Sequence, residues 1–201
     1  TCKRIRIDIA GGGPGKQIDF VAYLPTSAKG PVPIFVGLHL FDKESSHPTP
    51  GKSALLPGQG IPEGVPAEML PGDKTLDVIL RRGYGIGTIH ADDLAPDDKE
   101  KYLSGIIPTY WEKGQAKRKP DEWGALGAWA WGLSRVMDYL ETDKDVDASR
   151  VIAIGHSRRG KTALWAGAQD ERFAMIISNE SGCGGAALSR RFFGESVALI
   201  N

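Results

Sequence analysis

The first half of the chain alternates short apolar runs with connections rich in glycine and proline. Basic and isoleucine positions alternate over Lys3–Ile9, which predicts a half-exposed strand, and Ile18–Leu24 is predicted as its hairpin partner. The runs 33–40 and 84–90 are almost continuously apolar, as expected of strands that are covered on both faces. A short helix is predicted over Leu76–Arg82, where a glycine follows and ends it.

Segments without hydrophobic periodicity separate these elements. Residues 42–72, and residues from about 95 to about 120, are predicted as long loops because proline, glycine and serine are frequent there. The second half of the chain is more regular. Asp121 is predicted to cap a helix over Trp123–Leu140, which is apolar nearly all round and is therefore expected to be buried. Asp143–Ser149 is predicted as the turn that follows this helix.

Strands and helices continue to alternate after this turn. A short buried strand is predicted over Arg150–Gly155, a helix over Gly160–Ala168 and a further strand over Phe173–Ser178. This order predicts a three-layer α/β fold with a mostly parallel central sheet. The sequence shows no internal repeat and no domain boundary, so residues 1–201 are expected to form a single domain.

Composition and charge exclude several classes of function. The 201 residues carry 25 Lys+Arg and 25 Asp+Glu, so a zero net charge provides no electrostatic footprint for nucleic acid or an anionic membrane. No apolar run reaches the roughly 18 residues of a transmembrane helix, and without a signal-peptide pattern the start is expected to be mature or trimmed. Cys2 and Cys183 are too few for a disulfide framework or a Cys-based zinc site. His90 beside two vicinal aspartates is a weak metal pattern, and no metal site is predicted.

The candidate chemistry is concentrated in one sharp turn. Ser157 stands directly between a predicted buried strand and a predicted helix, which is the geometry that exposes a nucleophilic serine hydroxyl above a sheet. The helix N-terminus then faces the oxyanion that develops during acyl transfer. The general pattern is Gly-x-Ser-x-Gly, but here Arg159 occupies the place of the second glycine and Gly160 follows it. The alternative is that Ser157 only caps the following helix.

A serine nucleophile needs a base and an acid that orients the base. On this scaffold the chain order is serine, acid, histidine. Glu180 follows the predicted strand after Ser157, so it is expected at the same rim of the sheet, the alternative being an ordinary surface glutamate. No histidine follows Glu180, and His156 is expected to point away from its neighbour Ser157. The catalytic histidine is therefore expected outside this chain. The four histidines present are His39, His47, His90 and His156.

One motif is specific enough to indicate a family. Residues Gly155–Lys161 read GHSRRGK and fit the signature Gly-x-Ser-Arg-x-Gly-Lys, which accounts for the displaced glycine. With these residues the chain resembles the glucuronoyl esterases, which form carbohydrate esterase family 15, and in particular their bacterial branch. The flanking segments that resemble the same family are 121–135, 162–174 and 179–191.

The resemblance implies an α/β-hydrolase fold and a serine esterase. Its activity would be hydrolysis of the ester between 4-O-methyl-glucuronic acid of xylan and lignin alcohols, through an acyl-enzyme on Ser157. Glu180 matches the family acid, Arg158 matches the arginine that helps to stabilise the oxyanion, and Lys161 matches a lysine that contacts sugar hydroxyls. The implied partner is glucuronoxylan or a lignin–carbohydrate ester, with no cofactor, nucleic acid or membrane. A polymeric substrate implies a secreted or periplasmic protein.

The length of the chain leaves alternatives open. Members of the resembled family are considerably longer, so residues 1–201 are expected to be the N-terminal portion of the domain, without its C-terminal strands. One alternative changes the substrate to acetyl-xylan or a broad range of carboxylic esters. The second is a non-catalytic carbohydrate-binding domain, should the chain truly end at residue 201, in which case negligible turnover is expected because Ser157 lacks its base.

Overall fold

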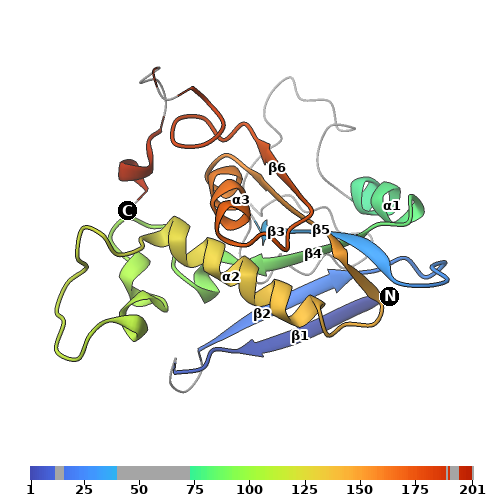
Figure 1. Ribbon diagram of the computed structural model, residues 1–201, viewed down its shortest axis with the longest axis horizontal. Helices are drawn as coiled ribbons and strands as arrows, with labels where there is room; N and C mark the ends of the chain where they lie inside the picture. The colour runs from blue at the N-terminus through green and yellow to red at the C-terminus, as the bar shows by residue number, and fades with distance from the viewer. Residues whose placement is uncertain (12–15, 40–72, 189, 191–194, 201) are drawn as a thin grey trace.

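The computed structural model describes residues 1–11, 16–39, 73–188, 190 and 195–200 (Figure 1). In this part of the chain one sheet contains β1 (Cys2–Asp8), β2 (Gln17–Tyr23), β3 (Val32–His39), β4 (Gly85–His90), β5 (Val146–His156) and β6 (Met175–Asn179). The α-helices of the same residues are α1 (Asp73–Arg81), α2 (Ala125–Leu140) and α3 (Arg158–Gln169). The predicted loop over 42–72 lies outside the described residues.

The sheet is mixed: its strands at one edge are antiparallel and the others are parallel. Its strand order is β1-β2-β4-β3-β5-β6. β1 pairs with β2, and β2 with β4, in antiparallel fashion, whereas β4, β3, β5 and β6 are parallel neighbours. The prediction of a mostly parallel sheet is therefore confirmed. The parallel strands bring their carboxyl ends to one edge of the sheet, which is where α/β folds place their sites.

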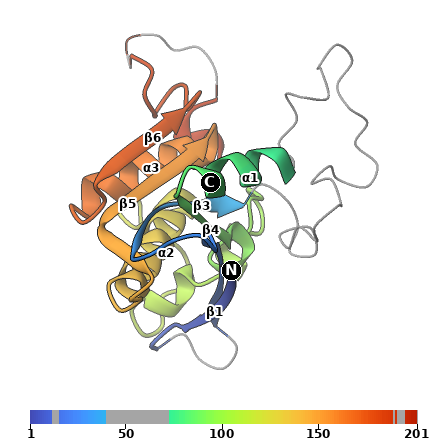
Figure 2. The same ribbon diagram turned by 90° about the vertical axis from the view of Figure 1, so that its right-hand side faces the viewer.

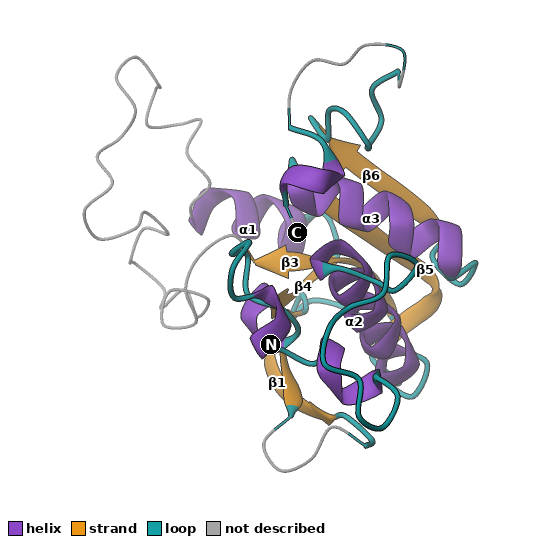
Figure 3. Ribbon diagram, turned by 90° about the vertical axis from the view of Figure 1, so that its left-hand side faces the viewer, coloured by secondary structure: helices purple, strands orange, loops and turns teal. Residues whose placement is uncertain are grey.

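The helices form the outer layers. Right-handed crossovers that run in opposite directions along a sheet place their helices on opposite faces. The step from β3 to β4 runs toward β1, whereas the steps to β5 and β6 run the other way, so α1 lies on one face and α2 and α3 on the other (Figures 2 and 3). α2 and α3 pack against each other and against β5. No helix among the described residues is long and apolar enough to cross a membrane.

Helix α2 forms the centre of the core on its face of the sheet. Most of its residues are buried, as its nearly uniform apolar pattern predicts. Trp129 is fully buried, and its Nε1 donates a hydrogen bond of 2.7 Å to the carbonyl oxygen of Ala95. Replacing a buried side chain of this size with alanine typically costs about 3–5 kcal/mol. The packing of α2 therefore holds the segment after β4 close to the sheet.

The start of α2 differs from its prediction. The helix begins at Ala125, and Gly124 is its N-cap residue, without a side-chain hydrogen bond to the first turn. Asp121 lies in the preceding turn and does not cap the helix. Trp123 is also outside the helix. Its ring stacks on Tyr110 with the centroids 5.6 Å apart, a tertiary contact that a local capping rule does not include.

The start of β5 also differs from its prediction. The strand begins at Val146, although a turn is predicted up to Ser149. Val146 is buried and pairs with Val32 of β3, so a long-range contact extends the strand through polar residues. The predicted loop of 95–120 contains two short 3₁₀ helices, Tyr102–Ser104 and Ile107–Tyr110.

Candidate active site

A single residue links β5 to α3. β5 ends at His156 and α3 begins at Arg158, so the chain reverses its direction at Ser157. Ser157 has φ 54° and ψ −121°, a conformation that typically costs a non-glycine residue about 1–3 kcal/mol. Two backbone hydrogen bonds hold it: the Ser157 N–H donates to the Asn179 carbonyl at 3.0 Å, and the Ser157 carbonyl accepts from the Lys161 N–H at 3.1 Å. The predicted sharp turn is therefore present and strained.

The hydroxyl of Ser157 is not used to support the helix. Ser157 is the N-cap residue of α3, but its side chain forms no capping hydrogen bond, and no other hydrogen bond of this hydroxyl occurs among the described residues. The alternative that Ser157 is only a helix cap is therefore wrong. The amide N–H groups of the first turn of a helix have no intrahelical acceptor. They are thus available to an anion at the start of α3.

Two glycines allow this tight turn. A Cβ atom on Gly155 would lie 2.1 Å from the carbonyl oxygen of Arg159. One on Gly160 would lie 2.9 Å from the Ser181 Cβ and 3.0 Å from the Asn179 carbonyl oxygen. The second glycine of the general pattern is displaced by one residue because position 160, and not position 159, packs against the neighbouring loop.

Glu180 lies beside the serine turn, as predicted. It follows the last residue of β6 and has φ 46°. Among the described residues, Ser157 and Glu180 are the only non-glycine residues with a positive φ. The Ser157 N–H to Asn179 carbonyl bond ties the two strained positions together. The structure therefore brings Glu180 to the same edge of the sheet as Ser157, while its function as the catalytic acid stays a prediction.

The side chain of Glu180 is largely exposed to solvent. It is 77% exposed, and its Oε2 lies 3.9 Å from the Nδ1 of His156. His156 Nδ1 is also 3.1 Å from the side-chain nitrogen of Asn179. His156 thus packs toward the end of β6. The Glu180 carboxylate, exposed at this edge, remains accessible to a further partner.

Lys161 is buried behind the loop that follows Glu180. Its Nζ donates a hydrogen bond of 2.7 Å to the Ser181 carbonyl oxygen, and Lys161 as a whole is 5% exposed. The Ser181 hydroxyl accepts from the Ala186 N–H at 2.7 Å and from the Ser178 hydroxyl at 2.7 Å. An ammonium group has three N–H donors. The bond to Ser181 therefore leaves donors of Lys161 available for another acceptor, and its contact with sugar hydroxyls stays a prediction.

Arg158 is held by two carboxylates, Asp97 and Glu195, that no sequence motif marks. Its Nη1 lies 2.6 Å from Asp97 Oδ1, its Nε donates to Glu195 Oε2 at 2.8 Å, and its Nη2 contacts Glu195 Oε1. The hydrogen bonds that Arg158 donates to Glu195 and then to Asp97 raise the pKa of Arg158 against the opposing effect of burial. The same guanidinium lowers the pKa of Glu195. The available signal was the cluster of cations at the start of α3, which requires acidic partners from elsewhere in the chain.

The described histidines do not supply the base of a triad in the expected chain order. His90 Nδ1 accepts a hydrogen bond from the Asp92 N–H at 3.2 Å, at the start of a 3₁₀ helix. The side chains of His39 and His47 lie outside what the structure describes, and no histidine occurs after Glu180. Among the described residues, no group of three or more His, Cys, Asp or Glu side chains is placed to hold a metal ion.

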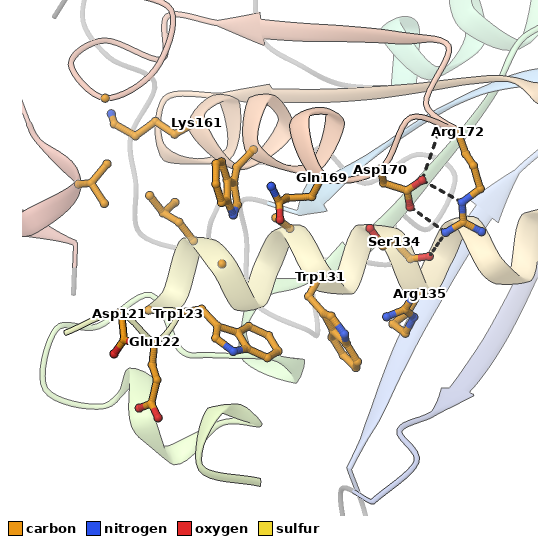
Figure 4. Close-up of a pocket in the computed structure, with 17 residues that line it drawn as sticks. Asp121, Glu122, Trp123, Trp131, Ser134, Arg135, Lys161, Gln169, Asp170 and Arg172 are labelled. Carbon is orange, nitrogen blue, oxygen red and sulfur yellow. Dashed lines mark hydrogen bonds and ion pairs between the residues drawn. The ribbon is translucent and has the colours of Figure 1, made fainter. Parts of the chain in front are cut away.

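A pocket of about 910 Å³ lies between α2 and α3 (Figure 4). Lys161 stands at one end of it and Arg172 at the other (Figure 4). Aromatic and polar side chains alternate between these ends, and Trp165 in this lining is 51% exposed. The pocket therefore extends along α3 from Lys161, four residues after Ser157, and offers flat apolar faces beside hydrogen-bonding groups. Its other labelled aromatic and polar side chains are Asp121, Glu122, Trp123, Trp131, Ser134, Arg135, Gln169 and Asp170.

Comparisons with known proteins agree on one family. The family model described as "Glucuronyl esterase, fungi" matches residues 80–197. A curated relative named carbohydrate esterase MZ0003, from an unknown prokaryotic organism, is 40% identical over 99% of this chain and 48% of its own length. A curated 4-O-methyl-glucuronoyl methylesterase of Hypocrea jecorina is 45% identical over 33% of this chain and 15% of its own length.

Solved structures extend the likeness to the fold. A glucuronoyl esterase from Solibacter usitatus aligns with a TM-score of 0.78 and 41% identity, over 96% of this chain and 51% of that one. A structure described as a promiscuous CE15 esterase from a marine bacterial metagenome aligns with a TM-score of 0.75 and 39% identity, over 100% of this chain and 52% of that one. The predicted α/β-hydrolase fold is confirmed. The chain spans about half the length of these relatives.

Proposed function

This chain belongs to the glucuronyl esterase family, carbohydrate esterase family 15, and on that premise we propose that the protein carrying it is a serine esterase. The proposed reaction is hydrolysis of the ester between 4-O-methyl-glucuronic acid of xylan and a lignin alcohol. The observation that carries the proposal is the strained backbone at Ser157, whose hydroxyl serves neither the helix nor any other described group. Strain of this kind is retained where the surrounding structure holds a residue for a function.

The proposed chemistry follows the general course of acyl transfer. Ser157 Oγ attacks the uronoyl carbonyl carbon, while a histidine outside these 201 residues takes the hydroxyl proton and Glu180 orients that histidine. The tetrahedral oxyanion is stabilised by amide N–H groups at the start of α3 and by Arg158. The histidine then gives its proton to the departing alcohol oxygen. A water molecule attacks the acyl-enzyme, releases the glucuronic acid and restores Ser157.

The pocket between α2 and α3 supports a carbohydrate substrate. Sugars present apolar faces that stack on aromatic rings and hydroxyls that bond to charged groups, and Trp165 and Lys161 offer both kinds of contact along one helix. We place the uronic acid near Lys161. A polymeric substrate cannot enter a cell, so the protein is proposed to act after secretion or in the periplasm.

A second candidate substrate class is favoured by one comparison. A structural neighbour with 39% identity is described as promiscuous, which favours a broader carboxylesterase or an acetyl-xylan esterase as the alternative. The discriminating experiment compares the complete natural protein on benzyl glucuronate and on acetylated xylan. We expect a kcat/KM at least about tenfold higher on the glucuronate ester. An equal or reversed preference would favour the alternative, and the absence of hydrolysis of both would remove the esterase proposal.

A further inference from the structure

One carboxylate connects two consecutive arginines at the start of α3. Asp97 Oδ1 lies 2.6 Å from Arg158 Nη1, and Asp97 Oδ2 lies 3.0 Å from Arg159 Nη2. The three side chains are largely buried, with exposed fractions of 20% for Asp97, 28% for Arg158 and 14% for Arg159. Each oxygen of Asp97 therefore binds a different guanidinium, and the two arginines are fixed relative to each other.

The segment that carries Asp97 is itself held in place. Leu94 and Ala95 are fully buried after β4. The Leu94 carbonyl accepts from the Ile106 N–H at 2.7 Å, and the Ala95 carbonyl accepts from Trp129 Nε1 at 2.7 Å. These bonds anchor the segment to the following loop and to the core helix α2. Asp97 thus stands on a rigid support and not on a free loop.

The charges at this end of α3 require such a partner. Residues 158–161 include three cations, although the helix dipole disfavours positive charge at an N-terminus. Asp97 and Glu195 balance the charges of Arg158 and Arg159, the first two of these cations. Arg159 also lies over the ring of Trp129, with its guanidinium carbon 5.7 Å from the ring centroid. Arg158 directly follows Ser157 in the chain.

From this arrangement we infer that Asp97 is a positioning residue, which fixes the guanidinium of Arg158 beside the Ser157 turn for the stabilisation of the oxyanion. The inference rests on the proposed esterase function. Asp97 acts through Arg158 and touches no reacting atom. A guanidinium has five N–H donors, of which Asp97 and Glu195 take three in the structure. Asp97 takes one of these three donors and Glu195 two, so the two carboxylates together fix the orientation of the donors that remain.

The test compares two aspartates that each bridge two arginines. Asp138 Oδ2 lies 2.6 Å from Arg135 Nε, and its Oδ1 lies 2.8 Å from Arg172 Nη2, which follows the end of α3 opposite Ser157. In the complete natural protein we expect Asp97→Asn to lower kcat for benzyl glucuronate about 10- to 100-fold, with KM changed less than about threefold. Asp138→Asn is expected to leave kcat unchanged. Equal kcat values for the two variants would overturn the inference.

Two further variants separate positioning from general support of the fold. Asp97→Glu keeps the charge but moves the carboxylate by one methylene, so it is expected to fold and to lower kcat to an intermediate value. In an Arg158→Met background, Asp97→Asn is expected to lower kcat by less than about twofold, since the group it positions is absent. Wild-type kcat in Asp97→Glu, or additive effects of Asp97→Asn and Arg158→Met, would overturn the inference.

The same variants distinguish this inference from the proposed substrate. Hydrolysis of p-nitrophenyl acetate depends on Ser157 and its oxyanion site, but not on uronic acid recognition. If the wild type cleaves only the acetate ester and Asp97→Asn slows that reaction at least about tenfold, the inference stands and the proposed substrate is wrong. If neither ester is cleaved, both fail.

Discussion

The arginines at the start of helix α3 and just beyond its end lie in opposite electrostatic settings. At the C-terminal end, Arg172 binds Asp170 at 2.7 Å, Asp138 at 2.8 Å and Glu141 at 2.6 Å. Asp138 lies in the last turn of α2, and Glu141 and Asp170 are the C-cap residues of α2 and α3. A cation near a helix C-terminus is favoured by the dipole. At the N-terminal end, Arg158 depends on carboxylates 61 and 37 positions away in the chain.

This contrast distinguishes charges that stabilise the fold, around Arg172, from charges that the candidate active site requires, around Arg158. The Arg172 cluster joins α2 and α3 with locally favourable charges. At the other end a residue with φ 54° precedes a run of cations that the dipole disfavours. The strained backbone and the cations at the helix N-terminus are both unfavourable for the fold. Their occurrence at one turn therefore indicates a functional constraint there. Changes at the serine turn should therefore alter activity, whereas changes around Arg172 should alter stability.

The largest effect is expected for loss of the serine hydroxyl. Ser157→Ala should lower kcat/KM of the complete natural protein by at least about 10⁴-fold, because no other group replaces the nucleophile. The melting temperature should stay the same, since the hydroxyl makes no hydrogen bond with the described residues. Ser149→Ala, on the exposed start of the same strand, is the matched control and should retain full activity. A similar loss in both variants would contradict the assignment.

Substitution of Arg158 should change mainly kcat, whereas substitution of Arg172 should change mainly the free energy of unfolding. Arg158→Met is expected to lower kcat about 10²- to 10³-fold, the usual cost of one lost oxyanion donor. Arg172→Met, at the end of the pocket away from Ser157, should change kcat less than about threefold. It should lower the free energy of unfolding by about 1–2 kcal/mol, because it removes a network and not an isolated surface pair. Kinetics and chemical denaturation of both variants check this. A kcat loss in Arg172→Met equal to that in Arg158→Met would remove the contrast.

Crowding at the serine turn predicts an intermediate effect. Gly160→Ala places a methyl group 2.9 Å from Ser181 Cβ and 3.0 Å from two backbone oxygens, so the free energy of unfolding should fall by about 1–3 kcal/mol. Gly30→Ala is the control, because no atom lies within 4 Å of its added Cβ. Denaturant titrations of both variants measure the difference. Equal stabilities would show that the turn tolerates the methyl group.

The smallest effect is a difference in acid sensitivity. The pKa of Asp170 is lowered by its hydrogen bond to Arg172 against the effect of burial, and that of Glu195 by its hydrogen bond to Arg158. A carboxyl with a lowered folded-state pKa stabilises the fold above its unfolded pKa, and this stabilisation is lost as pH falls through the lower value. At pH 7 we expect Asp170→Asn to cost about 1 kcal/mol and Glu195→Gln a few tenths, because Glu195 is more exposed.

Denaturation at pH 7 and at about pH 3 measures these two contributions. Both costs should be smaller at pH 3 than at pH 7, since the stabilisation by a paired carboxylate is lost progressively as pH falls below the unfolded-state pKa. A cost that stays constant between the two pH values would show that the carboxylate charge is not its source.

The order of the elements could be predicted because each depends on local signals. Continuous apolar runs mark the buried parallel strands, and a nearly uniform apolar segment marks α2. The predictions failed where a distant contact decides the boundary. Val146 joins β5 because it pairs with Val32, and Asp121 does not cap α2, which begins after Gly124.

In the candidate site, too, features that depend on local signals could be predicted and features that depend on distant contacts could not. The turn at Ser157 and the position of Glu180 follow from strand ends and a short motif, so the sequence was sufficient to place them at one edge. The partners of Arg158 were not predictable. Asp97 is one of several acidic residues in its segment, and only the folded chain shows which carboxylate reaches α3.

Covalent trapping tests the central claim, that Ser157 is the nucleophile, most directly. The complete natural protein would be treated with a fluorophosphonate, digested with trypsin and sequenced by mass spectrometry. The peptide of residues 151–158 contains a single serine, Ser157. We expect the phosphonate on Ser157 of this peptide, with benzyl glucuronate hydrolysis lost in proportion to labelling. Complete labelling of another residue, with Ser157 unmodified and hydrolysis abolished, would contradict the account.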